Sequence, residues 1–290
     1  MSKPLIVVTG KNGQLGWEIA QIVALYENAF EFLFTGRDEL DLSKPATIAP
    51  FFSKYKPDYF INCAAYTLVD KAETEQELAY ITNAESVGLI AQQCAIIDAK
   101  LITISTDYVF DGNGTSPYTI DTPTHPVNYY GYSKWMGEQL AINNCAHSII
   151  IRTSWVYSTH GNNFVKTMLR LMSDRPSLKV VADQIGSPTY AADLAETILK
   201  ILLSIEEGNA HYGIYHYSNT GVISWFDFAT AIATIGGKNC SVLPIPSSAY
   251  PTPAKRPGYS VMDTSGLVKD YGIELKGWEG SLEKCIKALL

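Results

Sequence analysis

The chain has 290 residues and a net charge of −7 at neutral pH, and 47% of its residues are hydrophobic. This length suits one large α/β unit or two closely joined domains, and the acidic balance argues against a nucleic-acid binder, which would carry a basic patch or stripe. No apolar stretch is long enough to cross a bilayer, no signal-peptide pattern opens the chain, and the five scattered cysteines form no CxxC pair. We therefore expect a cytoplasmic protein with reduced thiols that binds neither nucleic acid nor a membrane.

Short apolar, β-branched runs alternate with helical patterns over the first half of the chain. The expected strands are residues 5–9, 32–35, 59–62, 101–105 and 148–152, and the expected helices are residues 17–26, 75–97 and 130–142. Strands that alternate with helices indicate βαβ units and a parallel sheet with right-handed crossovers. The sequence therefore predicts an α/β fold with a Rossmann-type, doubly wound parallel sheet.

After Arg152 the pattern loosens into a smaller, partly irregular lobe. We expect helices at residues 165–172, 191–203, 225–235 and 282–289 and a strand at residues 178–181. Residues 244–257 carry five prolines, so we expect no regular structure there. The predicted division is a first domain of residues 1–152, which also takes elements from about residues 188–218, and a C-terminal lobe formed mainly by residues 153–290.

Three glycines, Gly10, Gly13 and Gly16, lie between the first expected strand and the helix that follows it. Glycines in this position permit a tight turn and let the backbone approach a pyrophosphate, which then sits at the positive end of the helix. The alternative is a plain turn, but the placement at the start of a βαβ run favours a dinucleotide site.

Arg37 follows the second expected strand and precedes Asp38 and Glu39. An acidic residue in this region usually binds the adenosine ribose hydroxyls, whereas an arginine can pair with a 2′-phosphate. The sequence therefore favours NADPH, with NADH as the alternative cofactor. The competing interpretation of Arg37 is a solvated turn residue.

Tyr130 and Lys134 are four residues apart in an expected helix and so share one of its faces. The ammonium of Lys134 should lower the pKa of the Tyr130 phenol below its free value of about 10. Such a tyrosine can exchange a proton with a carbonyl oxygen or an alcohol near neutral pH. Thr106 ends the fourth expected strand, where open α/β sheets place ligands, and its hydroxyl can bind the same oxygen. The alternatives are a surface Tyr–Lys pair and a threonine that satisfies a loop amide.

Several longer segments carry a family resemblance. They are GKNGQLG at 10–16, NCAAYT at 62–67 with VDKAE at 69–73, STDYVFDG at 105–112, YGYSKWMGE at 130–138, RTSWVY at 152–157, DQIGSPT at 183–189 and KRP at 255–257. In order and spacing they resemble the dTDP-4-dehydrorhamnose reductase family of the extended short-chain dehydrogenases/reductases. The resemblance covers nearly the whole chain, and STDYVFDG and RTSWVY are narrower motifs than the glycine loop or YxxxK.

The resemblance implies a reductase that converts the C4 ketone of dTDP-4-dehydro-L-rhamnose to dTDP-L-rhamnose, the last step of dTDP-rhamnose biosynthesis, with the sugar nucleotide held by the C-terminal lobe. Its catalytic residues fall on Thr106, Tyr130 and Lys134. The expected cofactor contacts are Gly10, Asn12, Gly13, Gln14, Leu15, Gly16, Arg37, Asp41, Leu42, Cys63, Ala64, Ala65, Tyr66, Tyr130 and Lys134. The expected substrate contacts are Thr106, Asp107, Val109, Phe110, Tyr130, Trp155 and Arg256, the last because a guanidinium pairs with a diphosphate.

Some relatives are described as carrying Mg²⁺ between carboxylates at a dimer interface. Glu18 matches one of those positions, but Asp193 stands where a glutamate is expected, and the histidines show no metal-binding spacing. We predict no catalytic metal and leave a structural Mg²⁺ and a homodimer open. Three competing functions also stay open: another NDP-4-keto-6-deoxysugar reductase, a non-catalytic NADP-binding regulatory subunit, and an epimerase that retains NAD⁺.

Overall fold

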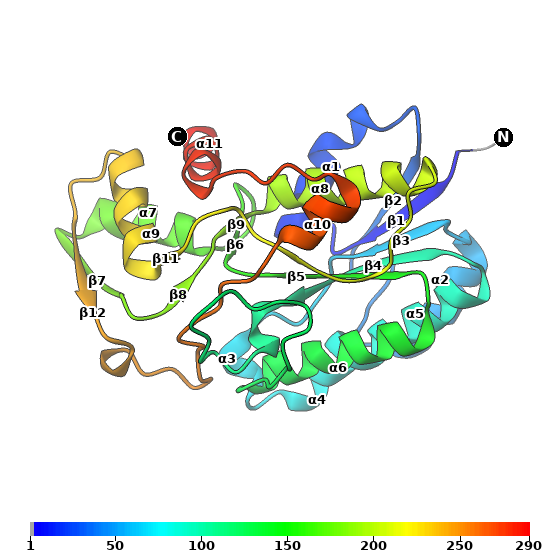
Figure 1. Cartoon of the computed structure of the whole chain (residues 1–290), viewed down its shortest axis with the longest axis horizontal. Helices are drawn as coiled ribbons and strands as arrows, with labels where there is room; N and C mark the ends of the chain where they lie inside the picture. The colour runs from blue at the N-terminus through cyan, green and yellow to red at the C-terminus, as the bar shows by residue number, and fades with distance from the viewer. Residues whose placement is uncertain (1–2) are drawn as a thin grey trace.

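A six-stranded parallel sheet forms the centre of the structure, a computed structural model that describes residues 3–290 (Figure 1). Its spatial order is β10-β5-β4-β3-β1-β2. The strands are β1 (Leu5–Thr9), β2 (Glu31–Thr35), β3 (Tyr59–Asn62), β4 (Lys100–Thr106), β5 (Ser148–Thr153) and β10 (Gly213–Tyr217). The chain changes direction across the sheet between β1 and β3, and open α/β sheets bind ligands at such a switch point.

Helices cover both faces of this sheet (Figure 1). One face carries α1 (Gln14–Ile22), α8 (Ala191–Glu206) and α10 (Ser265–Tyr271), and the other carries α2 (Ile48–Tyr55), α5 (Ser86–Ile96) and α6 (Tyr129–Asn144). Successive side chains of a strand point to opposite faces, so Ile6 and Val8 pack in the first core and Val7 in the second. Burial on both faces explains why the central strands are apolar runs without polar alternation.

The expected helix at residues 75–97 is interrupted. It consists of α4 (Gln76–Tyr80), a π-helical segment η3 (Ile81–Glu85) and α5. Helix α6 packs directly against η3, because a Cβ atom on Gly137 would lie 2.1 Å from the Asn83 carbonyl oxygen. A π segment inserts one residue into a helical turn and often marks a functional site. Here it places Asn83 beside α6.

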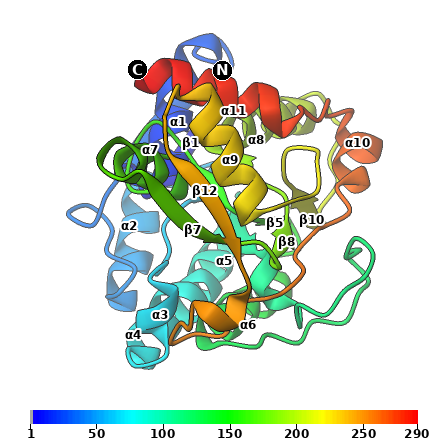
Figure 2. The ribbon, with the colours of Figure 1, turned by 90° about the vertical axis from the view of Figure 1, so that its left-hand side faces the viewer.

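The C-terminal lobe lies at one end of the sheet (Figure 1) and faces the viewer in Figure 2. It has its own core. Its helices are α7 (Phe164–Asp174), α9 (Trp225–Ile235) and α11 (Trp278–Leu289). Three two-stranded sheets complete it, pairing β6 (Val156–Tyr157) with β9 (Thr189–Tyr190), β7 (Ser177–Val181) with β12 (Ser241–Ile245), and β8 (Ile185–Gly186) with β11 (Ile223–Ser224). The remaining short helices are η1 (Val23–Leu25), η2 (Pro45–Thr47), α3 (Val69–Ala72), η4 (Asp107–Val109) and η5 (Ser247–Ala249).

The expectation that residues 244–257 lack regular structure is wrong at one end. Pro244 and Ile245 belong to β12, and η5 follows directly. Strand β12 pairs with β7 alone in a two-stranded sheet, so one of its edges needs no ladder hydrogen bonds. A proline without an N–H donor is tolerated in such an edge strand.

The two halves of the chain are interleaved, because β10, α8 and α10 all come from sequence after residue 152 and pack on the central sheet. Within residues 3–290, no helix combines the length and the apolar character needed to cross a membrane.

The close approach of α6 to η3 gives a stability prediction. Gly137→Ala forces a Cβ atom against the Asn83 carbonyl, so we expect the free energy of unfolding to fall by about 1–3 kcal/mol in urea denaturation, as for other overpacked sites. The matched control is Gly280→Ala in α11, where a Cβ atom would meet nothing within 4 Å. Alanine favours a helix interior, so the control should gain up to about 1 kcal/mol. Equal effects of the two substitutions would contradict the packing argument.

Candidate active site

Thr106, Tyr130 and Lys134 lie together at the C-terminal end of β4. Helix α6 begins where the Asn128 side chain accepts a hydrogen bond from the Gly131 N–H at 2.8 Å, a standard N-cap contact. This start places Tyr130 and Lys134 on the first two turns of α6 beside Thr106. The expected juxtaposition of the three side chains is therefore what the fold produces.

Lys134 is buried, and its ammonium donates to the Ile104 carbonyl oxygen at 2.6 Å. Burial lowers the pKa of Lys134 to about 8, although the negative charge of Glu138 opposes this change. The lysine is thus held at the end of β4, one helical turn from Tyr130.

The expectation of a lowered pKa for Tyr130 is wrong for the structure as it stands. Burial raises the pKa of the phenol well above its usual range, a hydrogen bond with Thr106 opposes the rise, and the nearby Asp107 adds to it. Lys134 directs its ammonium toward the Ile104 carbonyl, so it does not offset the burial of the phenol. The expectation counted one neighbouring charge and omitted desolvation.

A buried ion pair lies beneath Lys134. Arg152 on β5 donates to both carboxylate oxygens of Glu138 on α6, at 2.9 and 2.7 Å, and the two side chains are only 2% and 1% exposed. Ser105 on β4 donates to the same carboxylate, and His216 on β10 lies 3.4 Å from Arg152. The Glu138 carboxylate therefore joins β4 and β5 to α6, and β10 joins this group through Arg152.

Asn83 is a contributor that the sequence did not reveal. Its amide exchanges two hydrogen bonds with the backbone of Tyr66, at 2.8 and 3.0 Å, and donates to the Ser133 hydroxyl at 3.0 Å. Ser133 in turn donates to the Tyr130 carbonyl at 2.8 Å. The π segment thus links the loop after β3 to the first turn of α6. A 3.6-residue apolar pattern carries no signal for such a segment.

The glycine loop fits a pyrophosphate. Gly10 has a φ angle of +73°, and a Cβ atom on Gly16 would lie 2.3 Å from the Gly10 carbonyl oxygen, so the loop closes only with glycine at these positions. No side chain caps α1 at Gly13, which leaves the first N–H groups of this helix to an anion. The loop lies at the switch point of the sheet, where the small residues Cys63, Ala64 and Ala65 follow β3.

The other expected cofactor residues surround this loop or follow β2. Leu15, Leu42 and Tyr66 are buried, and Cys63, Ala64 and Ala65 are partly exposed. The Asn12 carbonyl lies 3.1 Å from the His160 ring, and Gln14 accepts a hydrogen bond from Asn163 at 3.0 Å, so the C-terminal lobe touches the loop. Asp41 binds Ser43, whereas Arg37 is exposed and forms no ion pair within residues 3–290.

Some of the expected substrate residues are buried in a core, and Arg256 is paired with an acidic residue. Val109 and Phe110 are fully buried in a small core with Tyr118 and Met262, which gives their side chains a packing role. Arg256 lies in the segment between η5 and α10, and its guanidinium donates to the carboxylate of Asp70 in α3 at 2.9 Å.

Trp155 has a strained backbone. Its φ angle of 48° is unusual for a bulky residue, and its indole stacks on Trp225 with the ring centroids 3.7 Å apart. Such strain persists only where the surrounding structure enforces it, and it is common at functional sites. The indole remains partly exposed.

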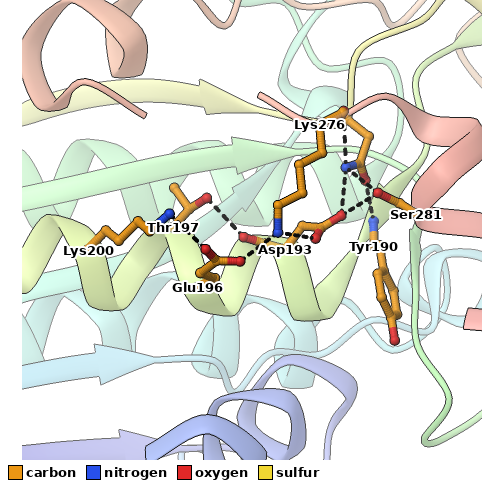
Figure 3. Close-up of polar contacts among 8 residues, drawn as sticks. Tyr190, Asp193, Glu196, Thr197, Lys200, Lys276 and Ser281 are labelled. Carbon is orange, nitrogen blue, oxygen red and sulfur yellow. Dashed lines mark hydrogen bonds and ion pairs between the residues drawn. The ribbon is translucent and has the colours of Figure 1, made fainter. Parts of the chain in front are cut away.

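The acidic residues considered for Mg²⁺ are bound by the chain itself. Glu18 accepts from the Ser158 hydroxyl at 2.6 Å, and Asp193 accepts from Asn219 at 2.9 Å. Asp193 also binds Lys276, at 2.9 Å, and Ser281 (Figure 3). Lys276 also contacts Glu196 at 2.6 Å. Across residues 3–290 no group of three or more His, Cys, Asp or Glu side chains is arranged to hold a metal ion. Lys276 supplies the positive charge beside Asp193 and joins α8 to the segment before α11.

A doubly wound sheet with a glycine loop after β1 and a Tyr–Lys pair beside the end of β4 defines a dinucleotide-binding oxidoreductase of the extended short-chain dehydrogenase/reductase type. The family model described as "RmlD substrate binding domain" matches residues 4–290. The chain belongs to this family.

Similar proteins cover almost the same length. A dTDP-4-dehydrorhamnose reductase of Burkholderia thailandensis is 41% identical over 98% of this chain and 99% of its own. The spore coat polysaccharide biosynthesis protein SpsK of Bacillus subtilis is 39% identical over 97% and 96%. A solved dTDP-4-dehydrorhamnose reductase of Bacillus anthracis in complex with NADP has a TM-score of 0.93 and 38% identity, with 99% and 100% of the two chains covered. A UDP-glucose 4-epimerase of Thermus thermophilus, at 17% identity and a TM-score of 0.80, shares the fold.

The buried ion pair gives a second stability prediction. Glu138→Gln leaves the Arg152 charge buried without a counter-charge, so we expect a loss of about 3–5 kcal/mol in the free energy of unfolding. The control is Glu283→Gln, which breaks an exposed pair with Lys287 and should leave the free energy of unfolding almost unchanged. Urea titration of both variants measures the difference, and a small effect at Glu138 would contradict the importance of the pair.

Proposed function

We propose that this chain is a dTDP-4-dehydrorhamnose reductase that reduces the C4 ketone of dTDP-4-dehydro-L-rhamnose to dTDP-L-rhamnose with NADPH. The observation that carries the proposal is the meeting of Thr106, Tyr130 and Lys134 at the end of β4, next to the glycine loop, in a chain whose relatives with this name match it over nearly their whole length. The three side chains support the reduction of a ketone, and the full-length match supports a sugar nucleotide as the substrate that carries it.

Tyr130 is the proposed proton donor. The bound nicotinamide would supply a hydride to the ketone carbon, and the ketone oxygen then needs a proton. Burial keeps the Tyr130 phenol protonated at neutral pH, and the protonated phenol is the form that can donate. Thr106 would hydrogen-bond the same oxygen. The Lys134 ammonium, one helical turn away and bonded to the Ile104 carbonyl, would stabilise the phenolate left by proton donation through its positive charge.

The two halves of the chain would bind the cofactor and the sugar nucleotide respectively. Residues 1–152, with α8 and β10, would form the NAD(P)-binding part, and the rest of residues 153–290 would hold the sugar nucleotide. The uncapped N-terminus of α1 would bind the pyrophosphate of the cofactor. Trp155 would lie against the sugar nucleotide, and Arg256 would exchange its partly exposed partner Asp70 for the substrate diphosphate.

Arg37 supports NADPH over NADH. It is exposed directly after β2, while the neighbouring Glu39 carboxylate is occupied by Lys11 and by the Gly36 N–H at 2.7 Å. A free guanidinium at this place can pair with a 2′-phosphate.

The decisive assay follows NADPH absorbance with dTDP-4-dehydro-L-rhamnose and no partner protein. We expect stoichiometric oxidation, formation of dTDP-L-rhamnose and a lower kcat/KM with NADH. Arg37→Ala should lose the preference for NADPH, and Lys54→Ala, which removes an exposed positive charge on α2, should keep it. A regulatory subunit would oxidise no NADPH alone, and an epimerase would show no net consumption. Faster turnover of a GDP-linked keto sugar would favour a different reductase.

Tyr130→Phe tests the proton donor. Removal of the hydroxyl should lower kcat by about 10²–10⁴-fold, because that is the usual contribution of a positioned acid, with little change in the Kd of NADPH. Tyr132→Phe changes a neighbouring, exposed tyrosine and should keep normal turnover. Near-normal kcat in Tyr130→Phe would overturn the assignment.

A further inference from the structure

Asp107 presents an unusual buried carboxyl next to the catalytic threonine. The residue is 2% exposed, and its Oδ1 atom accepts a hydrogen bond from the Thr106 hydroxyl at 2.9 Å. Its Oδ2 atom is buried and has no hydrogen-bond partner within residues 3–290. A buried carboxyl oxygen without a partner is uncommon, because losing water without a replacement bond is unfavourable.

The Thr106 hydroxyl has one proton, which can go either to Asp107 or to a substrate oxygen. Its oxygen already accepts a hydrogen bond from the Tyr108 N–H at 3.2 Å, and its proton points to Asp107. A hydroxyl that donates to Asp107 cannot donate to a substrate oxygen at the same time. The reduction proposed above needs Thr106 as a donor, because negative charge develops on the substrate oxygen.

We propose that Asp107 is a positioning residue whose protonation state sets the direction of the Thr106 hydroxyl. The inference rests on the proposed function. When Asp107 is ionised, it accepts the Thr106 proton. When Asp107 is neutral, its own O–H donates to the Thr106 oxygen. The Tyr108 N–H uses one lone pair of that oxygen, and the second becomes free when the Tyr130 hydroxyl turns to the substrate oxygen. The Thr106 proton then turns to the substrate oxygen.

The surroundings of Asp107 leave its charge uncompensated. The titratable groups that act on it are the phenols of Tyr108, in η4 itself, and Tyr130, on α6, while the C-terminal segment adds the neutral hydroxyl of Ser260. The cations of the surrounding elements are bonded elsewhere: Arg256 to Asp70, Lys134 to the Ile104 carbonyl, and Arg152 to Glu138.

Both protonation states of Asp107 are therefore accessible near neutral pH. Burial raises the pKa of its carboxyl to about 7, against the hydrogen bond from the Thr106 hydroxyl, which lowers it. The neutral form prevails below this pKa. As the pH rises through about 7, the ionised form takes the Thr106 proton, so kcat/KM for ketone reduction should fall.

The test is the pH profile of kcat/KM with NADPH and dTDP-4-dehydro-L-rhamnose. We expect the wild-type value to fall up to about tenfold per pH unit above pH 7 and the Asp107→Asn profile to be flat there, because an amide does not titrate. Asp111→Asn is the control, since this nearby carboxylate is hydrogen-bonded to the Asn113 N–H and has a lowered pKa. It should keep the wild-type inflection. A flat wild-type profile, or an inflection that survives in Asp107→Asn, would overturn the proposal.

A double-mutant cycle separates positioning from direct contact. In a Thr106→Val background, Asp107→Asn should change kcat/KM less than twofold at any pH, because Asp107 acts through the hydroxyl. Independent, multiplying losses would mean that Asp107 binds the substrate itself and would overturn the proposal.

Infrared spectroscopy provides a readout without turnover. The protonated carboxyl band lost in Asp107→Asn should titrate near pH 7 in the wild type, and a carboxyl already ionised at pH 5 would contradict the inference. If the wild type reduces no keto sugar at any pH, the proposed function fails. If it reduces the sugar without the inflection, only the role of Asp107 fails.

Discussion

The buried ion pair between Arg152 and Glu138 is the interaction on which the active site depends. It joins β5 to α6, and through Ser105 and His216 it reaches β4 and β10. Two desolvated charges are stable only when they satisfy each other, so the pair fixes the distance from α6 to the strand ends. Because Lys134 lies one helical turn before Glu138, the pair also determines where the lysine and Tyr130 meet Thr106.

Much of the fold is readable from the sequence, for a physical reason. The strand at residues 59–62 and the helix at residues 225–235 have the expected bounds, because fully buried runs and a Ser224 capping box define them locally. Strand β10 and helix α2 were not expected. The short segment at β10 contains the polar His216 and becomes a strand only by pairing with β5. The prediction of irregular structure at Pro244 is wrong because its strand forms only by pairing with β7, which the local sequence does not indicate.

In the candidate active site, too, local sequence rules predict some features, while others depend on tertiary packing. Strand-end placement and helical spacing are local rules, and they were sufficient to bring Thr106, Tyr130 and Lys134 together. The pKa of Tyr130 depends on everything packed around the phenol, so a rule that counts one lysine gave the wrong direction. Asn83 depends on a π segment, and its contacts with Tyr66 and Ser133 join segments that are far apart in the sequence.

The late position of β10 in the chain has a consequence for synthesis of the protein. While residues 213–217 are still to be made, β5 is the open edge of the sheet, and Arg152 lacks its neighbour His216. Helix α8, which covers one face of the sheet, and Lys276, which pairs with Asp193 on that helix, are made later than the first five strands. The N-terminal half therefore leaves the ribosome with an unpaired edge strand, which is a surface prone to aggregation. This edge and one face of the sheet are completed only when residues 191–217 have been made, so the two halves depend on each other for a complete core.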